Sequence, residues 1–406
     1  MNAVGIDVSK GKSTVTVLHP GREVVLPPFD VEHNREGFKR LVTILKKLDG
    51  DTKVVMEATG NYYLPVAQYL TSYDFFVSVV NPMLVKDYSS KLLTVRKVKT
   101  DSKDALKIAA FALDRWTELV PFCVQPDERS ILKTLNRQYD NCNKIKTMLK
   151  NNLISVLDQT FSGINKLFTS AAKRSNGREK WVDFVLRYPH SECVSGKSFT
   201  IFAKSYCSWC KKNEYHYSER KAKQIYEFAC NCIISLPLSN AAKLLVSNIA
   251  AQLSGMYEML ALLISQMHSI AQNLPEYDIV MSMYGVGYIL GPQLIAEIGD
   301  VSRFRKKQAL AAFAGVDPQP YQSGNLNPKS HPISKRGSPH LRKALFQVME
   351  AILKNAPANE PVFQFIDKKR KQGKLYRTYM TAGANKFLKI YFARVTEHLK
   401  LLRLAA

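Results

Sequence analysis

Short apolar runs separated by turn residues fill the first part of the chain, and their spacing predicts alternating strands and helices. Runs rich in Val and Ile predict strands, whereas apolar residues repeated at helical spacing predict helices. We expect strands at 3–7, 14–18, 24–31, 54–56 and 75–80, and helices at 37–48, 63–70 and 105–113. Three strands followed by alternating helices and strands are typical of a compact α/β domain.

The rest of the chain favours helices. Two long stretches, 127–160 and 241–274, carry apolar residues at helical spacing. They either pair as an antiparallel arm or coiled coil, or pack as ordinary helices within a domain. Between them, 161–240 has an irregular, aromatic pattern. The pattern from 275 onward is mostly helical and is interrupted by a loop at 316–339, and a loop of this length inside a folded region is often functional.

These patterns divide the 406 residues into three expected domains. They are an α/β domain at 1–120, a helical coiled-coil arm with an insertion at 121–274, and a mostly helical C-terminal domain at 275–406. The expected fold class is therefore α/β followed by α.

The formal net charge of +24 favours a polyanionic partner such as nucleic acid. A merely solvated basic surface is the plainer alternative. Membrane-surface binding is less favoured, because no apolar stretch approaches the roughly 18 residues of a membrane span. Seven scattered cysteines indicate reduced thiols and a cytoplasmic protein, and the first residues have a strand pattern rather than that of a signal peptide.

Four cysteines leave a zinc site open as an alternative. Cys207 and Cys210 form one pair and Cys230 and Cys232 another, with His216 nearby. The spacing of the second pair is unusual for a zinc finger, so buried thiols in a helical domain are favoured.

Four acids occupy positions that a folded α/β domain would bring together. Asp7 and Glu57 end two expected strands, and Asp101 and Asp104 lie at the start of an expected helix. Each has a plainer explanation, as a turn residue or a helix cap. Gathered in one place, however, the four carboxylates would repel one another unless a metal ion neutralised them, and hard oxygen ligands suit Mg²⁺. Acids at strand ends followed by a helical pair are the arrangement of a ribonuclease-H-like fold, which uses divalent ions for phosphodiester chemistry.

Several motifs around these acids and in the C-terminal region occur together and in order. They are Gly-Ile-Asp-Val-Ser-Lys at 5–10, Met-Glu-Ala-Thr-Gly-Asn-Tyr at 56–62, and the segments 79–82, 99–105, 284–287, 313–318, 321–324, 333–338 and 341–345. The set closely resembles the DEDD transposases of the insertion-sequence "one-ten" family, which are understood as bridge-RNA-guided recombinases.

The resemblance implies a two-part catalyst with a ribonuclease-H-like, or RuvC-like, N-terminal domain. Asp7, Glu57, Asp101 and Asp104 match the family's metal-binding tetrad, with Mg²⁺ as the expected ion. Ser323, which nothing in the residue pattern singles out, matches the nucleophilic serine of the C-terminal transposase domain.

The same resemblance implies partners and an assembly. Donor DNA, target DNA and a noncoding bridge RNA are expected, in a protein associated with the nucleoid. The homo-oligomer is expected to be a dimer of dimers, in which the acids of one subunit work with the serine of another.

Three other motifs are candidate nucleic-acid contacts, because close backbone approach and basic side chains both suit phosphates. A tight helix turn and solvated charged loops are the plainer alternatives. The motifs are Gly285 and Gly287 before a helix, Lys335, Arg336 and Arg342 around a glycine-containing loop, and the basic run Lys368, Lys369 and Arg370.

Two competing functions remain open at this point. A metal-dependent junction-resolving nuclease would use water as its nucleophile and would cut without Ser323. A noncatalytic nucleic-acid-binding protein would break no strand, with or without Mg²⁺. The presence of all four acids together with Ser323 favours the recombinase.

Overall fold

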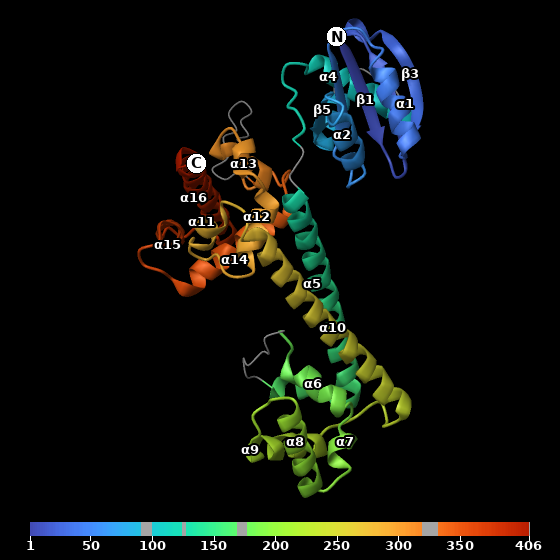
Figure 1. Ribbon diagram of the computed structural model, residues 1–406. Helices are drawn as coiled ribbons and strands as arrows, with labels where there is room; N and C mark the ends of the chain where they lie inside the picture. Colours follow the sequence, from blue (N-terminus) through green and yellow to red (C-terminus); the bar gives the residue numbers. More distant parts are fainter. Residues whose placement is uncertain (91–99, 124–126, 169–176, 319–331, 406) are drawn as a thin grey trace. The chain divides into compact units, whose positions relative to one another are not determined.

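The computed structural model describes residues 1–90, 100–123, 127–168, 177–318 and 332–405 (Figure 1). They form two compact units, Met1–Pro126 and Asp127–Ala406. The first unit ends close to the expected boundary at 120, while the division of the remainder into an arm and a C-terminal domain stays a prediction.

The N-terminal unit is built on a five-stranded sheet in the order β3-β2-β1-β4-β5. Strands β1 to β3 pair antiparallel, whereas β4 and β5 run parallel to β1. The strands are β1 (Asn2–Val8), β2 (Lys12–Leu18), β3 (Val24–Glu32), β4 (Thr52–Glu57) and β5 (Phe76–Val80), and the helices are α1 (Arg35–Leu45), α2 (Tyr63–Thr71), α3 (Pro82–Ser90) and α4 (Asp101–Asp114). The predicted α/β order is confirmed.

Helices cover both faces of this sheet. Helices α1 and α2 pack on one face, against side chains such as Val4 and Ile6 of β1. Helices α3 and α4 pack on the other face, where Ala3 of β1 meets Ile108 of α4. Because side chains alternate along a strand, Ala3, Gly5 and Asp7 belong to the face that α4 covers.

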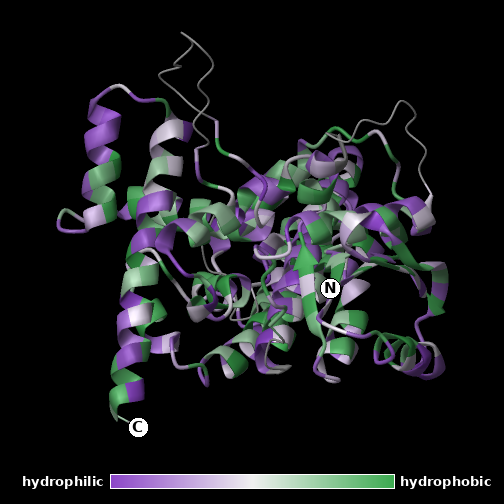
Figure 2. Cartoon of the chain, turned by 90° about the horizontal axis from the view of Figure 1, so that it is seen from above, coloured by the Kyte–Doolittle hydropathy of each residue, from purple (hydrophilic) through white to green (hydrophobic). Residues whose placement is uncertain are grey.

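The described part of the second unit is mostly helical. Its helices are α5 (Asp127–Thr160), α6 (Lys180–Arg187), α7 (Glu192–Ser195), α8 (Phe199–Lys212), α9 (Glu219–Cys230), α10 (Asn240–Ala271), α11 (Tyr277–Met281), α12 (Leu290–Ile298), α13 (Lys307–Ala314), α14 (Pro339–Asn355), α15 (Pro361–Lys371) and α16 (Tyr376–Ala405). The hydrophobic core of the C-terminal part joins residues from α12 to α16, and Figure 2 shows polar and apolar residues alternating along α16.

The long helices α5 and α10 pack against each other in opposite directions. Leu132 near the start of α5 shares a hydrophobic cluster with Ala271 at the end of α10. Cys142 meets Leu260 further along, and the last turns of α5 pack against the first half of α10. The antiparallel pairing that the apolar spacing allowed is therefore present.

The described part of the segment 161–240, which was expected to be irregular, contains four α-helices instead. They are α6 to α9, and they surround an aromatic core that includes Phe184, Tyr206 and Trp209. The helices are short and bury aromatic rings at few positions each, so their apolar spacing is hard to recognise in the sequence. Cys210 is buried in this core, and burial raises the pKa of its thiol.

No helix in the described part of the chain has the length and apolar character needed to cross a membrane.

Candidate catalytic site and nucleic-acid interface

A close crossing of α4 over β1 determines where the N-terminal acids lie. A Cβ atom added to Gly5 would stand 2.2 Å from the Ala105 carbonyl oxygen and 2.5 Å from the Ala109 amide nitrogen. Only glycine permits this approach, because any other side chain would collide with the helix backbone. The crossing therefore fixes the first turn of α4 relative to β1.

Asp7 and Glu57 occupy neighbouring positions at the ends of two paired strands. Ile6 of β1 pairs with Met56 of β4 in the parallel ladder, and Asp7 and Glu57 are the next residues of the two strands. Both are half-buried. Because parallel strands end at the same edge of a sheet, the prediction that these strand ends are neighbours is confirmed at the level of the backbone.

The two helix acids lie at the same edge. Helix α4 starts at Asp101 because the Thr100 side chain caps it, accepting a hydrogen bond from the Lys103 amide. Ala105 of α4 lies over Gly5, and Ile108, further along the helix, packs with Ala3. Its first turn, with Asp101 and Asp104, therefore lies toward the Asp7 end of β1.

The acids already interact with basic side chains. Lys107 Nζ lies 2.7 Å from Asp104 Oδ1. A hydrogen bond with Asp30 raises the pKa of Lys12, and the charge of Asp101 contributes to this shift. Lys12 begins β2, next to the end of β1. Two lysines near this edge therefore act on the helix acids, Lys107 on Asp104 and Lys12 on Asp101.

In the described residues, no three His, Cys, Asp or Glu side chains are gathered closely enough to hold a metal ion. The donor set nonetheless fits a hard cation, because Asp7, Glu57, Asp101 and Asp104 offer only carboxylate oxygens. The Lys107 ammonium on Asp104 shows that a positive charge is accepted at this position.

Ser323 lies outside the described residues, but both segments that flank it are held together. Pro318 forms an antiparallel bridge with Ile333, and Ser334 Oγ donates a hydrogen bond of 2.7 Å to Asp317 Oδ1. A Cβ atom on Gly337 would stand 2.1 Å from the Phe313 carbonyl oxygen. The two segments that lead into and out of residues 319–331 are thus tightly packed against each other.

Arg342 has a structural role where these two segments meet. Its Nη1 donates to the carbonyl oxygens of Ala314 and Gly337, each at 3.0 Å, and burial lowers the pKa of its guanidinium. Lys335 and Arg336 are exposed in the same loop, and Lys335 has a left-handed backbone with φ of 53°. Whether these three residues contact phosphates stays a prediction.

The glycine turn lies between α11 and α12, as expected for a helix pair. Gly285 has φ of 79°, and a Cβ there would stand 2.7 Å from Ile352 Cγ1 of α14. Its packing on α14 thus explains this glycine. Gly287 has no atom within 4 Å of its added Cβ, so its backbone is open to a partner.

The basic run lies at the end of α15. Lys368 and Arg370 are exposed, and Lys369 stands 5.0 Å from the Phe365 ring centre. Asp367 pairs with Arg370 at 3.7 Å and with Lys371 at 2.8 Å, which lowers the pKa of its carboxyl. Part of the positive charge is therefore neutralised within the helix.

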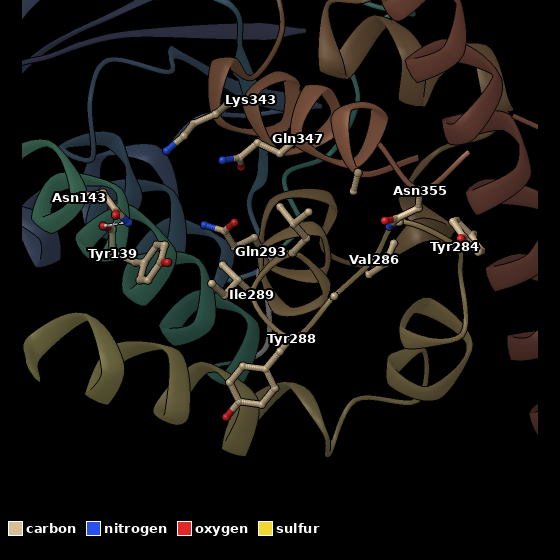
Figure 3. Close-up of a pocket in the computed structure, with 14 residues that line it drawn as sticks. Tyr139, Asn143, Tyr284, Val286, Tyr288, Ile289, Gln293, Lys343, Gln347 and Asn355 are labelled. Carbon is tan, nitrogen blue, oxygen red and sulfur yellow. Dashed lines mark hydrogen bonds between the residues drawn. The ribbon is translucent and has the colours of Figure 1, made fainter. Parts of the chain in front are cut away.

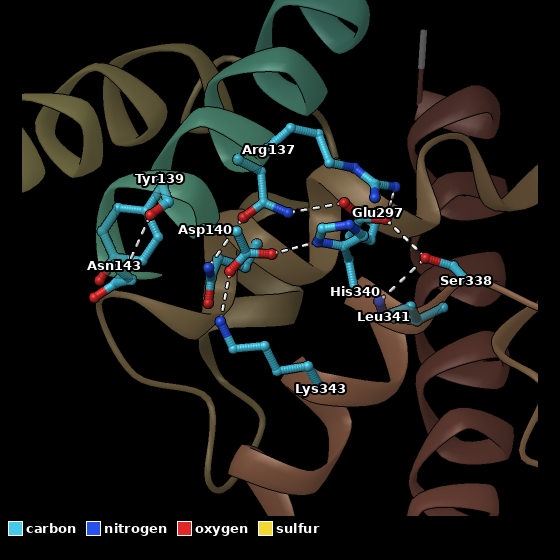
Figure 4. A network of polar contacts seen from close by, with 11 residues as sticks. Arg137, Tyr139, Asp140, Asn143, Glu297, Ser338, His340, Leu341 and Lys343 are labelled. Atoms are coloured by element: carbon cyan, nitrogen blue, oxygen red, sulfur yellow. Dashed lines mark hydrogen bonds and ion pairs between the residues drawn. The ribbon is translucent and has the colours of Figure 1, made fainter. Parts of the chain in front are cut away.

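Two buried carboxylates that were not predicted from the sequence connect α5 to α12 and to the start of α14 (Figure 4). Glu297 of α12 accepts hydrogen bonds from Asn136 at 2.8 Å, Arg137 at 2.9 Å and Ser338 at 3.0 Å.

The second carboxylate, Asp140 of α5, pairs with His340 and with Lys343, whose Nζ is 2.6 Å away. The sequence signal for Glu297 was its position as an acid inside the apolar helix α12. Nothing comparable marked Asp140, which lies in a helix with many polar residues.

An open pocket of about 700 Å³ lies beside these contacts (Figure 3). Tyr288, Ile289 and Gln293 line it from α12 and the turn before it, and Lys343 and Gln347 line it from α14. Tyr139 and Asn143 of α5 complete one side.

Two family models match the chain. A model of IS110-type DEDD elements, described as "Transposase", matches residues 4–162 and so includes all four acids. The model described as "Transposase IS116/IS110/IS902 family" matches residues 277–362, which include the glycine turn and the segment with Ser323.

Individual relatives agree with these matches. The pilin gene-inverting protein of Moraxella bovis is 24% identical over 373 residues, which are 90% of this chain and 88% of that protein. The uncharacterized 44.8 kDa protein of insertion element IS116 from Streptomyces clavuligerus is 23% identical over 300 residues, 74% of this chain and 71% of that protein. The transposase for insertion sequence element IS1111A from Coxiella burnetii is 37% identical over 76 residues, 19% and 21% of the two chains. The chain belongs to the IS116/IS110/IS902 family of transposases.

Proposed function

We propose that this transposase cuts and rejoins DNA through a covalent phosphoserine intermediate, guided by a noncoding RNA. As a transposase it is a DNA-modifying enzyme. The observation that best supports a catalytic role for the acids is the crossing of α4 over Gly5, which directs the first turn of α4 toward the edge where β1 and β4 end.

The strand order β3-β2-β1-β4-β5, with antiparallel β1 to β3 and parallel β4 and β5, supports a ribonuclease-H-like fold for this unit. We propose Asp7, Glu57, Asp101 and Asp104 as the ligands of Mg²⁺, consistent with the general divalent-metal dependence of DEDD nucleases. When bound, the ion would supply positive charge against the phosphate oxygens of the scissile strand.

Ser323 is the proposed nucleophile. Its hydroxyl oxygen attacks the phosphorus, the bond from phosphorus to the 3′ oxygen breaks, and the 3′ oxygen leaves and gains a proton. The serine proton passes to a base or to water. The products are a 5′ phosphoserine ester and a free 3′-hydroxyl. Since one ester replaces another, attack by a second 3′-hydroxyl can reverse the step with a new strand and without ATP.

The test is a search for a DNA adduct on a denaturing gel. The full-length protein is incubated with Mg²⁺, donor and target DNA and the flanking noncoding RNA. We expect an adduct with the wild-type protein and none with Ser323→Ala or Asp7→Ala. Ser302→Ala is the matched control, because Ser302 is an exposed serine of the same unit.

Each other outcome identifies a different function. If the DNA is cleaved without an adduct, and Ser323→Ala still cleaves it, the protein is the junction-resolving nuclease with water as its nucleophile. Binding without any strand breakage in Mg²⁺ indicates a noncatalytic protein. An adduct that forms equally well without RNA refutes the guided mechanism while leaving the serine chemistry intact.

We further propose a dimer of dimers that bridges the two DNAs. The support is the resemblance of most of the chain outside 161–240 to its family, together with the net charge of +24, which suits several nucleic-acid strands at once.

A further inference from the structure

The pocket between α5, α12 and α14 has the chemistry of a site for a single flat ring. Its volume of about 700 Å³ lies within the range of small-molecule sites. Its walls combine apolar side chains such as Val286 and Leu290 with the rings of Tyr139 and Tyr288. Among the described residues no Asp or Glu lines it, and the one charged residue that does is Lys343. A neutral or anionic ligand therefore suits it better than a cation.

Tyr288 provides a fixed aromatic surface at this pocket. Its side chain is 58% exposed, yet its ring stacks on His268 with centres 3.6 Å apart. His268 is itself buried and held by Tyr277 and by the backbone carbonyl of Tyr288. A ring whose plane is fixed in this way loses little entropy when a second ring stacks against it.

Side-chain amides supply the polar groups. Gln293 is 5% exposed, and its Nε2 donates to Asn136 Oδ1 at 3.0 Å. Its carbonyl oxygen has no hydrogen-bond partner among the described residues, and Gln293 is one of the residues that line the pocket. Gln347 and Asn355 add two exposed amides. Amides offer both donors and acceptors, as the edge of a nucleobase does.

We propose that this pocket binds one unpaired nucleobase, presented by a nucleic-acid strand that tracks the basic surface of the protein. This inference rests on the proposed nucleic-acid function but concerns a site separate from the four acids. The base would stack against an aromatic wall and exchange hydrogen bonds with Gln293 and Gln347, while Lys343 lies close enough to attract the strand's phosphates.

The probe is a short strand of abasic sites that carries one central adenine, compared with the same strand without any base. Binding to the full-length protein is measured by fluorescence anisotropy. We expect the single base to tighten binding about tenfold, the effect of stacking one base on an aromatic residue. Equal affinity of the two strands for the wild-type protein overturns the proposal.

Two variants test the location. Ala351→Trp should place a bulky ring in the pocket and remove the tenfold advantage without changing the affinity for the abasic strand. Gln347→Ala, at an exposed position, should reduce the advantage without disturbing the fold. Glu350→Gln is the control, because Glu350 is exposed on the same helix but does not line the pocket. An advantage that survives both pocket variants, with their circular dichroism unchanged, refutes the site.

Two comparisons identify the source of the base and separate this inference from the catalytic one. RNA and DNA versions of the probe are compared, and the larger advantage indicates which strand supplies the base. Ser323→Ala should lose the DNA adduct but keep the single-base advantage. If the pocket variants lose the single-base advantage but still form the DNA adduct, the pocket has a binding role only. If the wild-type protein shows the advantage but forms no adduct, only the strand-cutting proposal is refuted.

Discussion

Replacing Gly5 by alanine tests whether the crossing of α4 over β1 positions the helix acids. The new methyl group would stand 2.2 Å from the Ala105 carbonyl oxygen, 2.5 Å from the Ala109 amide nitrogen and 2.8 Å from the Ala109 Cβ. Two of these atoms belong to the backbone of α4, so no side-chain rotation relieves the clash. The helix must move away from the sheet.

The size of this movement follows from the contact. Ordinary van der Waals separation begins at 3.4 Å, so the backbone of α4 has to retreat by about 1 Å at Ala105. Overpacking of this kind costs about 1–3 kcal/mol in the free energy of unfolding. Because Asp104 directly precedes Ala105, the acid pair moves with the helix. A misplacement of about 1 Å in a catalytic group can lower a rate about 100-fold.

The assays measure the two effects separately. Urea unfolding with peptide-resolved hydrogen exchange reports the stability of α4, and the rate of Mg²⁺-dependent adduct formation reports the acids. Gly255→Ala is the matched control, because Gly255 is exposed in α10 and its added Cβ meets no atom within 4 Å. A Gly5→Ala protein with wild-type exchange in α4 and a wild-type rate would refute the reasoning.

Three other predictions concern stability, pH and salt. Glu297→Ala leaves Asn136 and Arg137 without their buried acceptor and should lower the free energy of unfolding by about 3 kcal/mol in urea; a change below 1 kcal/mol in the same titration contradicts this. Burial lowers the pKa of His33 in the folded state, so the unfolded state binds the proton more readily. The stability that the neutral ring contributes is therefore present above pH 6.5 and is lost as the pH falls below this value. Thermal unfolding from pH 7 to pH 5 should show this loss, and His33→Asn should reduce it. Affinity for DNA should fall steeply with salt, measured by anisotropy, and a flat profile would argue against broad phosphate contact.

The N-terminal fold was predictable because its signals are local. Runs of apolar residues predicted the strands. Because β1 and β4 are parallel neighbours, their ends place Asp7 next to Glu57 without any contribution from distant parts of the chain. The apolar pattern of α4 begins only at 105, but Asp101 and Asp104 were expected at the start of this helix, and α4 does begin at Asp101. The Thr100 cap extends the helix back to Asp101, and capping depends on a single side chain.

Features that depend on distant parts of the chain were not predictable from the sequence. The guanidinium of Arg342 donates to two backbone carbonyls that only the packing of α13 against α14 brings within reach, while its expected contact with phosphates stays a prediction. Glu297 and Arg137 are 160 positions apart, so no spacing rule connects them. Charged residues near one another in space but not in sequence are the common cause of such omissions.

The position of Asp7 in one compact unit and the assignment of Ser323 to the other suggest a decisive test of shared active sites. If the acids of one subunit act with the serine of another, Asp7→Ala chains and Ser323→Ala chains are each inactive alone but complement each other when mixed. Denaturing and refolding the two variants together should then restore the adduct, carried only by the Asp7→Ala chain, which keeps its serine. A size tag on one variant identifies that chain on the gel. If each subunit uses its own acids and its own serine, every chain in the mixture lacks one of the two, and no adduct can form at any mixing ratio.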